Sequence, residues 1–71
     1  MSEFYEMQEK WIETEEGENI YFDNREELRE ILSKRHGRQI AESEVVGLID
    51  NMVLEIDDEI YVYHEYNQPY D

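Results

Sequence analysis

The sequence predicts a small α+β domain in which two β-hairpins flank a pair of short helices. Near each end of the chain, apolar residues alternate around an acidic turn, a pattern typical of two-stranded hairpins. Between these segments, apolar residues recur at helical spacing in two stretches that follow one another across Gly37. No Pro-rich or Gly-rich linker divides the 71 residues, so we expect residues 1–71 to form a single domain.

The first hairpin is expected in the segment KWIETEEGENIYFD, residues 10–23. Gly17 can supply the positive φ that its turn needs. We expect Thr14 to lie opposite Asn19, which places Trp11 opposite Phe22. This register gathers one apolar face, the expected core side, from Tyr5, Met7, Trp11, Ile20 and Phe22.

A helix is the competing interpretation of residues 3–15, because Phe4, Met7 and Trp11 are spaced i, i+3, i+7. The order would then be helix, strand, helix, helix, hairpin, which is the order of a winged-helix domain. We prefer the strand, and the winged-helix-like arrangement with an N-terminal helix stays as the alternative.

Residues 24–37 predict the clearest helix. Asn24 can cap it, Glu27 can complete a capping box, and Gly37 suits the position after the last turn. Its apolar stripe consists of Leu28, Ile31 and Leu32. The bases of this region, Arg25, Arg29, Lys34, Arg35 and Arg38, are expected to pair with the helix's own glutamates, Glu26, Glu27 and Glu30.

A second helix is predicted in the segment SEVVGLIDNM, with Ser43 as its N-cap. Its apolar stripe falls at i, i+3, i+4 and i+7 and consists of Val45, Leu48, Ile49 and Met52.

The last hairpin is expected in MVLEIDDEIYVYHEY, residues 52–66. A three-residue loop at residues 57–59 would place Leu54, Ile56, Ile60 and Val62 on one apolar face. A two-residue loop would set Ile60 and Val62 opposite that face. We prefer the first register. It turns Tyr61 and Tyr63 outward, where they are the predicted homodimer interface, since Tyr is enriched at contact surfaces. Residues 67–71 are expected to be a frayed tail.

The charge of the chain is strongly negative: 20 Asp and Glu against 6 Lys and Arg, a formal net charge of −14. Direct nucleic-acid binding is disfavoured, because phosphate contacts need Lys and Arg. The chain has no cysteine nucleophile and no glycine-rich phosphate loop, and the acidic run at residues 57–59 lacks the ligand pattern of a calcium loop. We therefore expect a protein that is not an enzyme and has no cofactor and no metal.

Location is predicted from what the chain lacks. It has no cysteine, no leader pattern at the N-terminus, and no apolar run near the ~20 residues of a membrane span. We expect a cytoplasmic protein without membrane contact.

Acidic residues recur at every second or third position of both hairpins. Same-side neighbours on a strand lie about 6.5 to 7 Å apart, a spacing suited to a groove that normally follows a phosphate backbone. A basic DNA-binding protein could therefore bind these residues in place of DNA. The predicted partner-binding residues are Glu13, Glu15, Glu16, Glu18, Glu55, Asp57, Asp58 and Glu59.

In size, charge, aromatic content and lack of cysteine, the whole chain resembles the small acidic DNA-mimic proteins that phages direct against host DNA-binding proteins. Among them it is most similar to the phage inhibitors of the bacterial histone-like protein HU. The resemblance lies in charge and composition, not in a motif, so it assigns no role to single residues. It implies a non-enzymatic inhibitor, often dimeric, that occupies the DNA-binding surface of HU or a similar basic protein in the bacterial host cytoplasm. The alternative is an interaction module or regulator that docks through the Tyr-rich C-terminal hairpin.

Overall fold

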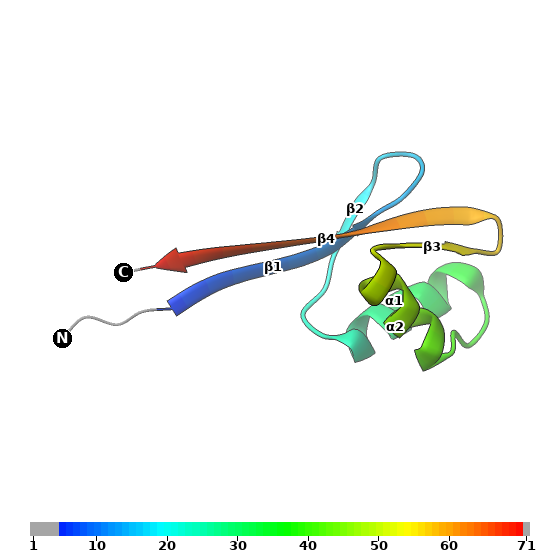
Figure 1. The fold of residues 1–71 in the computed structure, drawn as a ribbon. Helices are drawn as coiled ribbons and strands as arrows, with labels where there is room; N and C mark the ends of the chain where they lie inside the picture. The colour runs from blue at the N-terminus through cyan, green and yellow to red at the C-terminus, as the bar shows by residue number, and fades with distance from the viewer. Residues whose placement is uncertain (1–4, 71) are drawn as a thin grey trace.

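The computed structural model describes the backbone of residues 5–70 and the side chains of residues 9–66. Its elements follow the order β1 (Tyr5–Glu13), β2 (Asn19–Tyr21), α1 (Arg25–His36), α2 (Glu42–Asn51), β3 (Val53–Ile56) and β4 (Glu59–Tyr70). The strands form one antiparallel sheet in the order β2–β1–β4–β3. Both helices lie on the same side of this sheet (Figure 1). The predicted α+β class, with a hairpin, two helices and a second hairpin, is confirmed.

The ends of α1 follow from local side-chain chemistry. Asn24 Oδ1 accepts a hydrogen bond from the Glu27 N–H at 2.8 Å, and Glu27 Oε1 accepts one from the Asp23 N–H at 2.6 Å. At the other end Gly37 takes a left-handed conformation, φ 66°, and its N–H is bonded to the Ser33 carbonyl. The predicted cap and stop are therefore confirmed.

Helix α2 begins earlier than expected. Ala41 is the last residue before the helix, and the Glu44 carboxylate accepts the Ala41 N–H at 3.3 Å. Ser43 thus lies inside the first turn, and its prediction as N-cap is wrong. Met52 ends the helix with φ 66° and is exposed, so it does not belong to the buried stripe, which is formed by Val45 and Leu48.

The β1–β2 register differs from the prediction by one residue. Trp11 lies opposite Tyr21 and Ile12 opposite Ile20. The reason is a tighter turn than expected. The Thr14 N–H donates to the Glu18 carbonyl and Thr14 Oγ1 accepts the Glu18 N–H, at 2.9 and 3.1 Å, and only three residues lie between them.

This shift decides which side of β1 faces the helices. Ile12 is fully buried in the core, while Trp11 lies on the opposite face of the sheet and is partly exposed. The predicted core face through Trp11 is therefore wrong, although Phe22 and Ile20 do contribute to the core. The side chains of Tyr5 and Met7, expected on the same face, lie outside the described residues.

The segment expected to be either strand or helix is a strand. Residues 5–13 of β1 pair with residues 62–70 of β4 along their whole length. The winged-helix-like alternative with an N-terminal helix is therefore wrong over the described residues. Pairing with a partner some fifty positions away outweighs the local helical spacing, because tertiary context overrides propensity.

The β3–β4 turn has two residues instead of three. Ile56 lies opposite Glu59, and the intervening Asp57 and Asp58 have φ of 50° and 70°. Both are left-handed, as a type I′ turn requires, and Asp tolerates this conformation better than most residues.

The two-residue turn reverses the predicted faces of this hairpin. Tyr61 and Tyr63 are 0% and 4% exposed and lie in the core, whereas Ile60 and Val62 are 42% and 37% exposed on the other face. The prediction that the two tyrosines point outward is wrong, and neither ring lies on the surface expected for a dimer contact. Leu54 and Ile56 do face the helices, as predicted.

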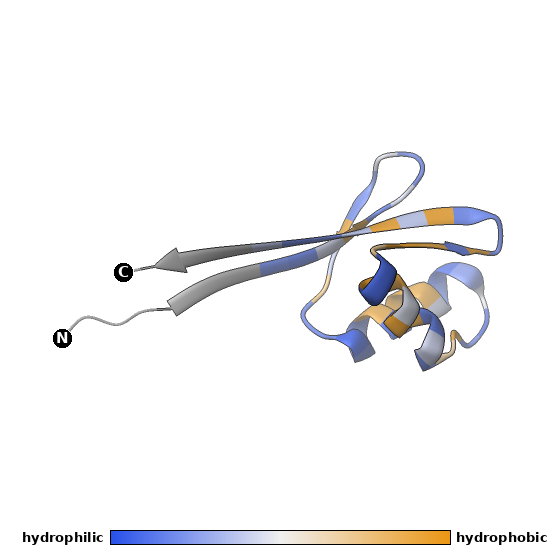
Figure 2. Ribbon diagram, in the orientation of Figure 1, coloured by the Kyte–Doolittle hydropathy of each residue, from blue (hydrophilic) through white to orange (hydrophobic). Residues whose placement is uncertain are grey.

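The core lies between the helices and one face of the sheet, and both helices carry apolar residues among their hydrophilic ones (Figure 2). Among the described residues, its buried members are Ile12, Phe22, Leu28, Leu32, Ile40, Val45, Leu48, Ile56, Tyr61 and Tyr63.

The distal part of the β1–β4 ribbon extends beyond the helices (Figure 1). We call residues 5–9 of β1 and 66–70 of β4 the arm. Because the backbone of residues 67–70 is paired with β1, the frayed tail expected there is replaced by strand, and Asp71 lies outside the described residues. The arm makes the molecule long, with principal extents of 49 × 22 × 19 Å.

Candidate acidic binding surface

Arg35, in the last turn of α1, joins the acidic turns of the two hairpins. Its guanidinium lies 3.3 Å from Glu18 Oε1 and 3.7 Å from Glu16 Oε1, both near the β1–β2 turn. It also binds Glu59 at the start of β4 with two hydrogen bonds, of 3.2 and 3.0 Å. The two hairpins therefore present their acids at one end of the sheet. We call this surface the acidic tip, formed by Glu15, Glu16, Glu18, Asp57, Asp58 and Glu59.

Glu59 is the most firmly held carboxylate of the tip. Besides the paired contact with Arg35, it accepts a 2.6 Å hydrogen bond from the Tyr61 hydroxyl. The hydrogen bonds from Arg35 and Tyr61 lower the pKa of Glu59, and Glu59 in turn raises the pKa of Arg35. Burial, followed by the hydrogen bond to Glu59, raises the pKa of Tyr61. Glu59 therefore stays ionised and fixed in position.

Asp57 is held in a similar way by Arg38. The guanidinium donates from Nε to Oδ2 at 3.0 Å and from Nη2 to Oδ1 at 3.2 Å. These hydrogen bonds lower the pKa of Asp57. Arg38 also reaches Glu44 of α2 at 3.6 Å, which ties the β3–β4 turn to α2 and to the loop that follows α1.

His36 fills the space between these two arginine-centred groups. Its side chain is 8% exposed, with Nδ1 3.4 Å from Asp57 Oδ2 and Nε2 2.7 Å from the Tyr61 hydroxyl oxygen. Since that hydroxyl donates to Glu59, its oxygen can accept from the His36 Nε2–H. The polar groups beneath the tip are thus hydrogen-bonded, as buried polar groups need to be.

Glu15 and Asp58 complete the tip. The Glu15 carboxylate accepts the Ile60 backbone N–H at 2.9 Å, a second link between the hairpins. Asp58 has no ion-pair partner among the described residues. An open depression of about 520 Å³ lies between them, lined by Glu15, Glu16, Arg35, Asp58 and Glu59.

Six of the eight predicted partner-binding residues thus lie together at the tip, and Glu13 and Glu55 do not. Glu13 is on the face of the sheet opposite the helices, where it lies 3.0 Å from His64 Nε2. Glu55 is exposed on the same face, opposite Ile60. The predicted line of charge is therefore broken into a compact tip and two separate carboxylates.

The role of the arginines was not foreseen. Arg35 and Arg38 were expected to pair within α1, but they reach acids of both hairpins and of α2. The sequence signal that could have pointed to this role is that two arginines stand at and just beyond the end of the predicted helix, while two acidic turns stand elsewhere in the chain. Only the fold brings these segments together.

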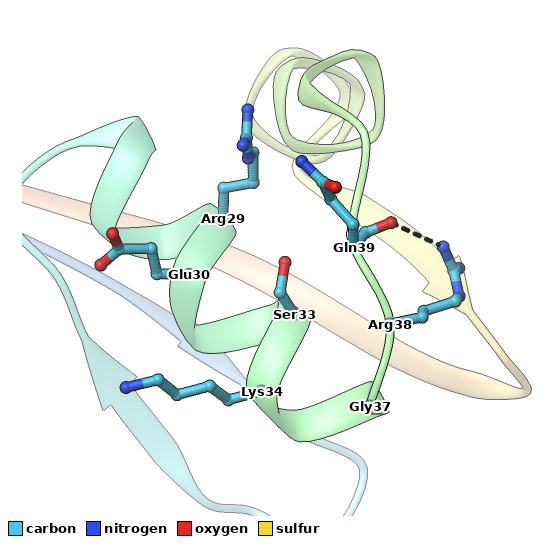
Figure 3. A pocket seen from close by; sticks show the side chains of 7 residues that line it. All are labelled: Arg29, Glu30, Ser33, Lys34, Gly37, Arg38 and Gln39. Atoms are coloured by element: carbon cyan, nitrogen blue, oxygen red, sulfur yellow. Dashed lines mark hydrogen bonds between the residues drawn. The ribbon is translucent and has the colours of Figure 1, made fainter.

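A second depression, of about 570 Å³, lies beside the last half of α1 and the loop after it (Figure 3). The side chains of Arg29 and Gln39 point toward the same end of it, while Lys34 extends to the other side of α1 in this view. Ser33 Oγ accepts the Ile40 N–H at 3.0 Å and so serves the loop. Arg38 is engaged with Asp57, and the lining contains no paired nucleophile and base.

Comparison with protein-family models, with curated proteins and with solved structures finds no match. Within the described part of the chain, no helix combines the length and apolar character needed to cross a membrane. The surface chemistry of the chain itself therefore carries the functional interpretation.

Proposed function

We propose that this protein is a non-enzymatic DNA-mimic inhibitor that occupies the DNA-binding surface of a basic protein, such as the bacterial histone-like protein HU. The observation that carries the proposal is the acidic tip: six carboxylates from two separate turns lie at one end of the sheet around only two arginines. Lys and Arg side chains that normally contact phosphates would contact these carboxylates instead.

The tip is suited to this role because its acids are held before binding. Arg35 and Arg38 keep Glu59 and Asp57 ionised and in place, so a partner has less side-chain ordering to impose. Among the described residues, the carboxylates of Glu16 and Glu18 form ion pairs with Arg35 alone. Their side chains stay 78% and 57% exposed. They are the acids best placed to meet a partner's cations.

Long-range attraction supports the same proposal. With a net charge of −14, the protein would be steered toward a basic partner, which raises the association rate. Exposed charges are screened over a Debye length of about 8 Å at physiological ionic strength. Binding through the tip should therefore weaken as salt is added.

Competition for DNA tests the proposal. Labelled duplex DNA is bound to purified HU, and the protein is added in increasing amounts at two salt concentrations. We expect release of DNA from HU, most readily at the lower salt concentration. DNA that stays bound at any excess removes HU as the target.

A charge-matched pair of variants separates the tip from the overall charge. The double substitution Glu16→Gln/Glu18→Gln should weaken competition, because it removes two exposed carboxylates of the tip. The control Glu26→Gln/Glu30→Gln removes the same charge from exposed positions of α1. Equal loss in both variants would show that net charge, and not the tip, governs binding.

A second candidate function is an interaction module. The C-terminal hairpin exposes Ile60, Val62 and Tyr66 on the side away from the helices, which favours docking to a protein through apolar contacts. Partner binding that is insensitive to salt and unaffected by Glu16→Gln/Glu18→Gln would support this function over the inhibitor.

A further inference from the structure

His36 is a largely enclosed titratable side chain beneath the acidic tip. It lies in the last turn of α1, with 8% of its side chain exposed. Its ring meets the Tyr61 ring edge to face, with centroids 5.8 Å apart and an interplanar angle of 80°. Both ring nitrogens face oxygen atoms: Nδ1 lies 3.4 Å from Asp57 Oδ2, and Nε2 lies 2.7 Å from the Tyr61 hydroxyl oxygen. The ring is therefore fixed between the β3–β4 turn and β4.

These contacts form a chain that runs from one carboxylate to another. It begins at Asp57 and passes through both nitrogens of His36 to the Tyr61 hydroxyl. It ends at Glu59 Oε1, which is 2.6 Å from that hydroxyl. Each of the three links joins two electronegative atoms, so each needs a hydrogen between them. The source of these hydrogens determines the charge of the ring.

Both ends of the chain can only accept hydrogen bonds. The hydrogen bonds from Arg38 lower the pKa of Asp57, and those from Arg35 and Tyr61 lower the pKa of Glu59. Both carboxylates are therefore ionised at neutral pH and offer no hydrogen. Burial and the hydrogen bond to Glu59 raise the pKa of Tyr61, so its hydroxyl keeps its single hydrogen, which lies in the link to Glu59.

His36 has to supply the other two hydrogens. The Tyr61 oxygen can accept only from Nε2–H, and Asp57 can accept only from Nδ1–H. An imidazole with hydrogen on both nitrogens is the cationic form. In the neutral form with hydrogen on Nε2, the Nδ1 lone pair faces the Asp57 carboxylate with no hydrogen between them. With hydrogen on Nδ1 instead, the link to Tyr61 is lost. The complete chain is therefore that of an imidazolium.

We propose that His36 is a proton-binding switch beneath the acidic tip. The protonated ring completes the chain between Asp57 and Glu59, and it adds a positive charge to those of the two arginines already bound there. The neutral ring leaves Asp57 facing a lone pair, and the tip then carries one more negative charge. Arg38 holds Asp57 with two hydrogen bonds in either state, so the turn keeps its place and the charge of the tip changes.

Charged groups from every neighbouring element lie around this ring. Asp57 of the turn and Glu59 of β4 are 3.4 and 4.0 Å from its nitrogens. Arg35 and Arg38 oppose a further positive charge, but each is itself bound to one of these acids. Three more acids reach the arginines, two from the β1–β2 turn and one from α2: Glu16, Glu18 and Glu44. Acids thus outnumber bases here, and the surroundings accommodate the charge of an imidazolium.

Titration of the isolated chain tests the proposal. Imidazole titrates between pH of about 5 and 8, and nuclear magnetic resonance can follow His36 and His64, the two histidines of the sequence. The Tyr61 ring signals should change together with those of His36. The free energy of unfolding should fall as the His36 proton is lost, because the neutral ring lacks one contact. His36→Gln should remove this fall, whereas the control His64→Gln, which leaves the tip untouched, should retain most of it.

Asp57→Asn keeps the size of the side chain and changes what it offers the ring. Its amide can donate to Nδ1, so a neutral His36 completes the chain, and Asn suits the left-handed conformation of this position, φ 50°. We expect the proton affinity of His36 to fall about tenfold, a shift of roughly one pH unit in its titration midpoint. The control Asp58→Asn removes the same charge from the next residue and should shift the midpoint far less. Equal midpoints in wild type and Asp57→Asn, or Tyr61 signals that ignore the His36 titration, overturn the proposal.

A consequence for binding rests on the proposed function. Because the proton adds positive charge beneath the tip, a basic partner should bind the form with neutral His36 more tightly, and its binding should expel the proton. The ratio of wild-type to His36→Gln competition for HU should therefore fall about fivefold or more from pH of about 8.5 to 5.5. Comparing both proteins at the same pH cancels effects of pH on HU and DNA.

The outcomes separate this inference from the proposed function. Competition by wild type with a ratio that does not change with pH overturns the switch as a control of binding. Absence of competition at any pH contradicts the proposed function instead. The titrations of wild type, Asp57→Asn and Asp58→Asn need no partner, so they decide in either case whether His36 binds its proton through this chain.

Discussion

Arg35 both links the acidic turns of the two hairpins and holds the Glu59 carboxylate in place. Its side chain is 28% exposed, yet it contacts acids from both hairpins and binds Glu59 with two hydrogen bonds. Exposed ion pairs contribute little, typically 0 to about 1 kcal/mol, but here the guanidinium also separates carboxylates that would otherwise repel one another. The stability of the fold and the shape of the acidic tip therefore depend on the same side chain.

Arg35→Met should lower the free energy of unfolding by about 1 kcal/mol, after allowance for solvent screening. For a domain of this size, such a loss lowers the melting temperature by roughly 4 to 8 °C. Thermal unfolding followed by circular dichroism measures it. The neighbouring Lys34→Met removes the same charge from an exposed residue without an ion-pair partner among the described residues. It should change the melting temperature little, and an equal loss would contradict the role given to Arg35.

The benefit from Arg35 should disappear in acid. The pKa of Glu59 is lowered in the folded state by the hydrogen bonds from Arg35 and Tyr61. The unfolded state therefore binds more protons as the pH falls below about 4.5, and the stabilisation is lost as the pH falls through the folded pKa. Urea unfolding of wild type and Arg35→Met from neutral pH to pH of about 3 should show a difference that is constant above about pH 5 and shrinks below it. A difference that grows in acid would contradict this linkage.

Tyr63 gives the corresponding prediction in alkali. Burial, followed by a hydrogen bond to Glu65, raises the pKa of Tyr63 to about 12. Because the folded pKa is above the unfolded value of about 10, the neutral phenol stabilises the fold below pH of about 10. That contribution is lost as the pH rises toward 12. Tyrosinate absorbance should rise in a late step for the native protein, and this step should be smaller in Tyr63→Phe. A single titration of all tyrosines near their ordinary pKa would show that Tyr63 is not buried.

The β3–β4 turn is the element that decides which residues of β4 face the core. Both of its central residues are left-handed, and Asp58, at φ 70°, carries no ion pair among the described contacts. Glycine is favoured in the second position of such a turn. Asp58 therefore adds a carboxylate to the acidic tip, but it introduces backbone strain that a glycine at this position would avoid.

Asp58→Gly should relieve this strain and raise the free energy of unfolding by about 0.5 to 1 kcal/mol. This value is the stabilisation from the lost left-handed strain minus the destabilisation from the greater entropy of glycine in the unfolded chain. Urea unfolding measures the change, and Asp58→Ala should be less stable than the glycine variant. If Asp58 also contacts a basic partner, both variants should weaken HU competition equally, since both lose the carboxylate. Opposite effects of the two variants on competition would assign the loss to turn geometry instead.

The whole molecule has to fold against its own charge. Arg35 and Arg38 neutralise part of the tip, but a net charge of −14 on 71 residues still destabilises the compact state by self-repulsion. Small domains bury only about 60% of the surface of the unfolded chain, so their stability is marginal. Added salt screens this repulsion and should therefore raise the free energy of unfolding.

The melting temperature should rise as sodium chloride is increased from low to physiological ionic strength, because repulsion among twenty acids outweighs the few ion pairs that salt also weakens. The measurement is made at a concentration where the chain is monomeric, so that dimer formation does not contribute. A melting temperature that falls with salt would show that the Arg35 and Arg38 pairs, and not overall repulsion, control stability.

Residues close together in the sequence were sufficient to predict α1. Its cap at Asn24, its stop at Gly37 and its buried Leu28 and Leu32 all follow from residues within a few positions of one another. The same holds for the presence of two hairpins, since each has its turn residues between its strands. The acidity of both turns was likewise evident, because composition does not depend on the fold.

Tertiary structure decided which side of each strand faces the helices. Both sides of β4 carry apolar residues, Ile60 and Val62 on one side and Tyr61 and Tyr63 on the other, so alternation alone favours neither. The fold buries the tyrosines because a two-residue turn sets their side toward the helices and because Glu59 and Glu65 accept from their hydroxyls. Ile60 and Val62 are then left on the exposed face of the sheet, opposite the helices.

The acidic tip depended on the fold in the same way. Arg35 is separated from Glu18 and Glu59 by 17 and 24 positions, and no local pattern relates them. The contact exists because β1 and β4 pair with each other and so set the two hairpins side by side next to the end of α1. The sequence contains the charges, and the long-range strand pairing, which no local propensity encodes, determines which of them meet.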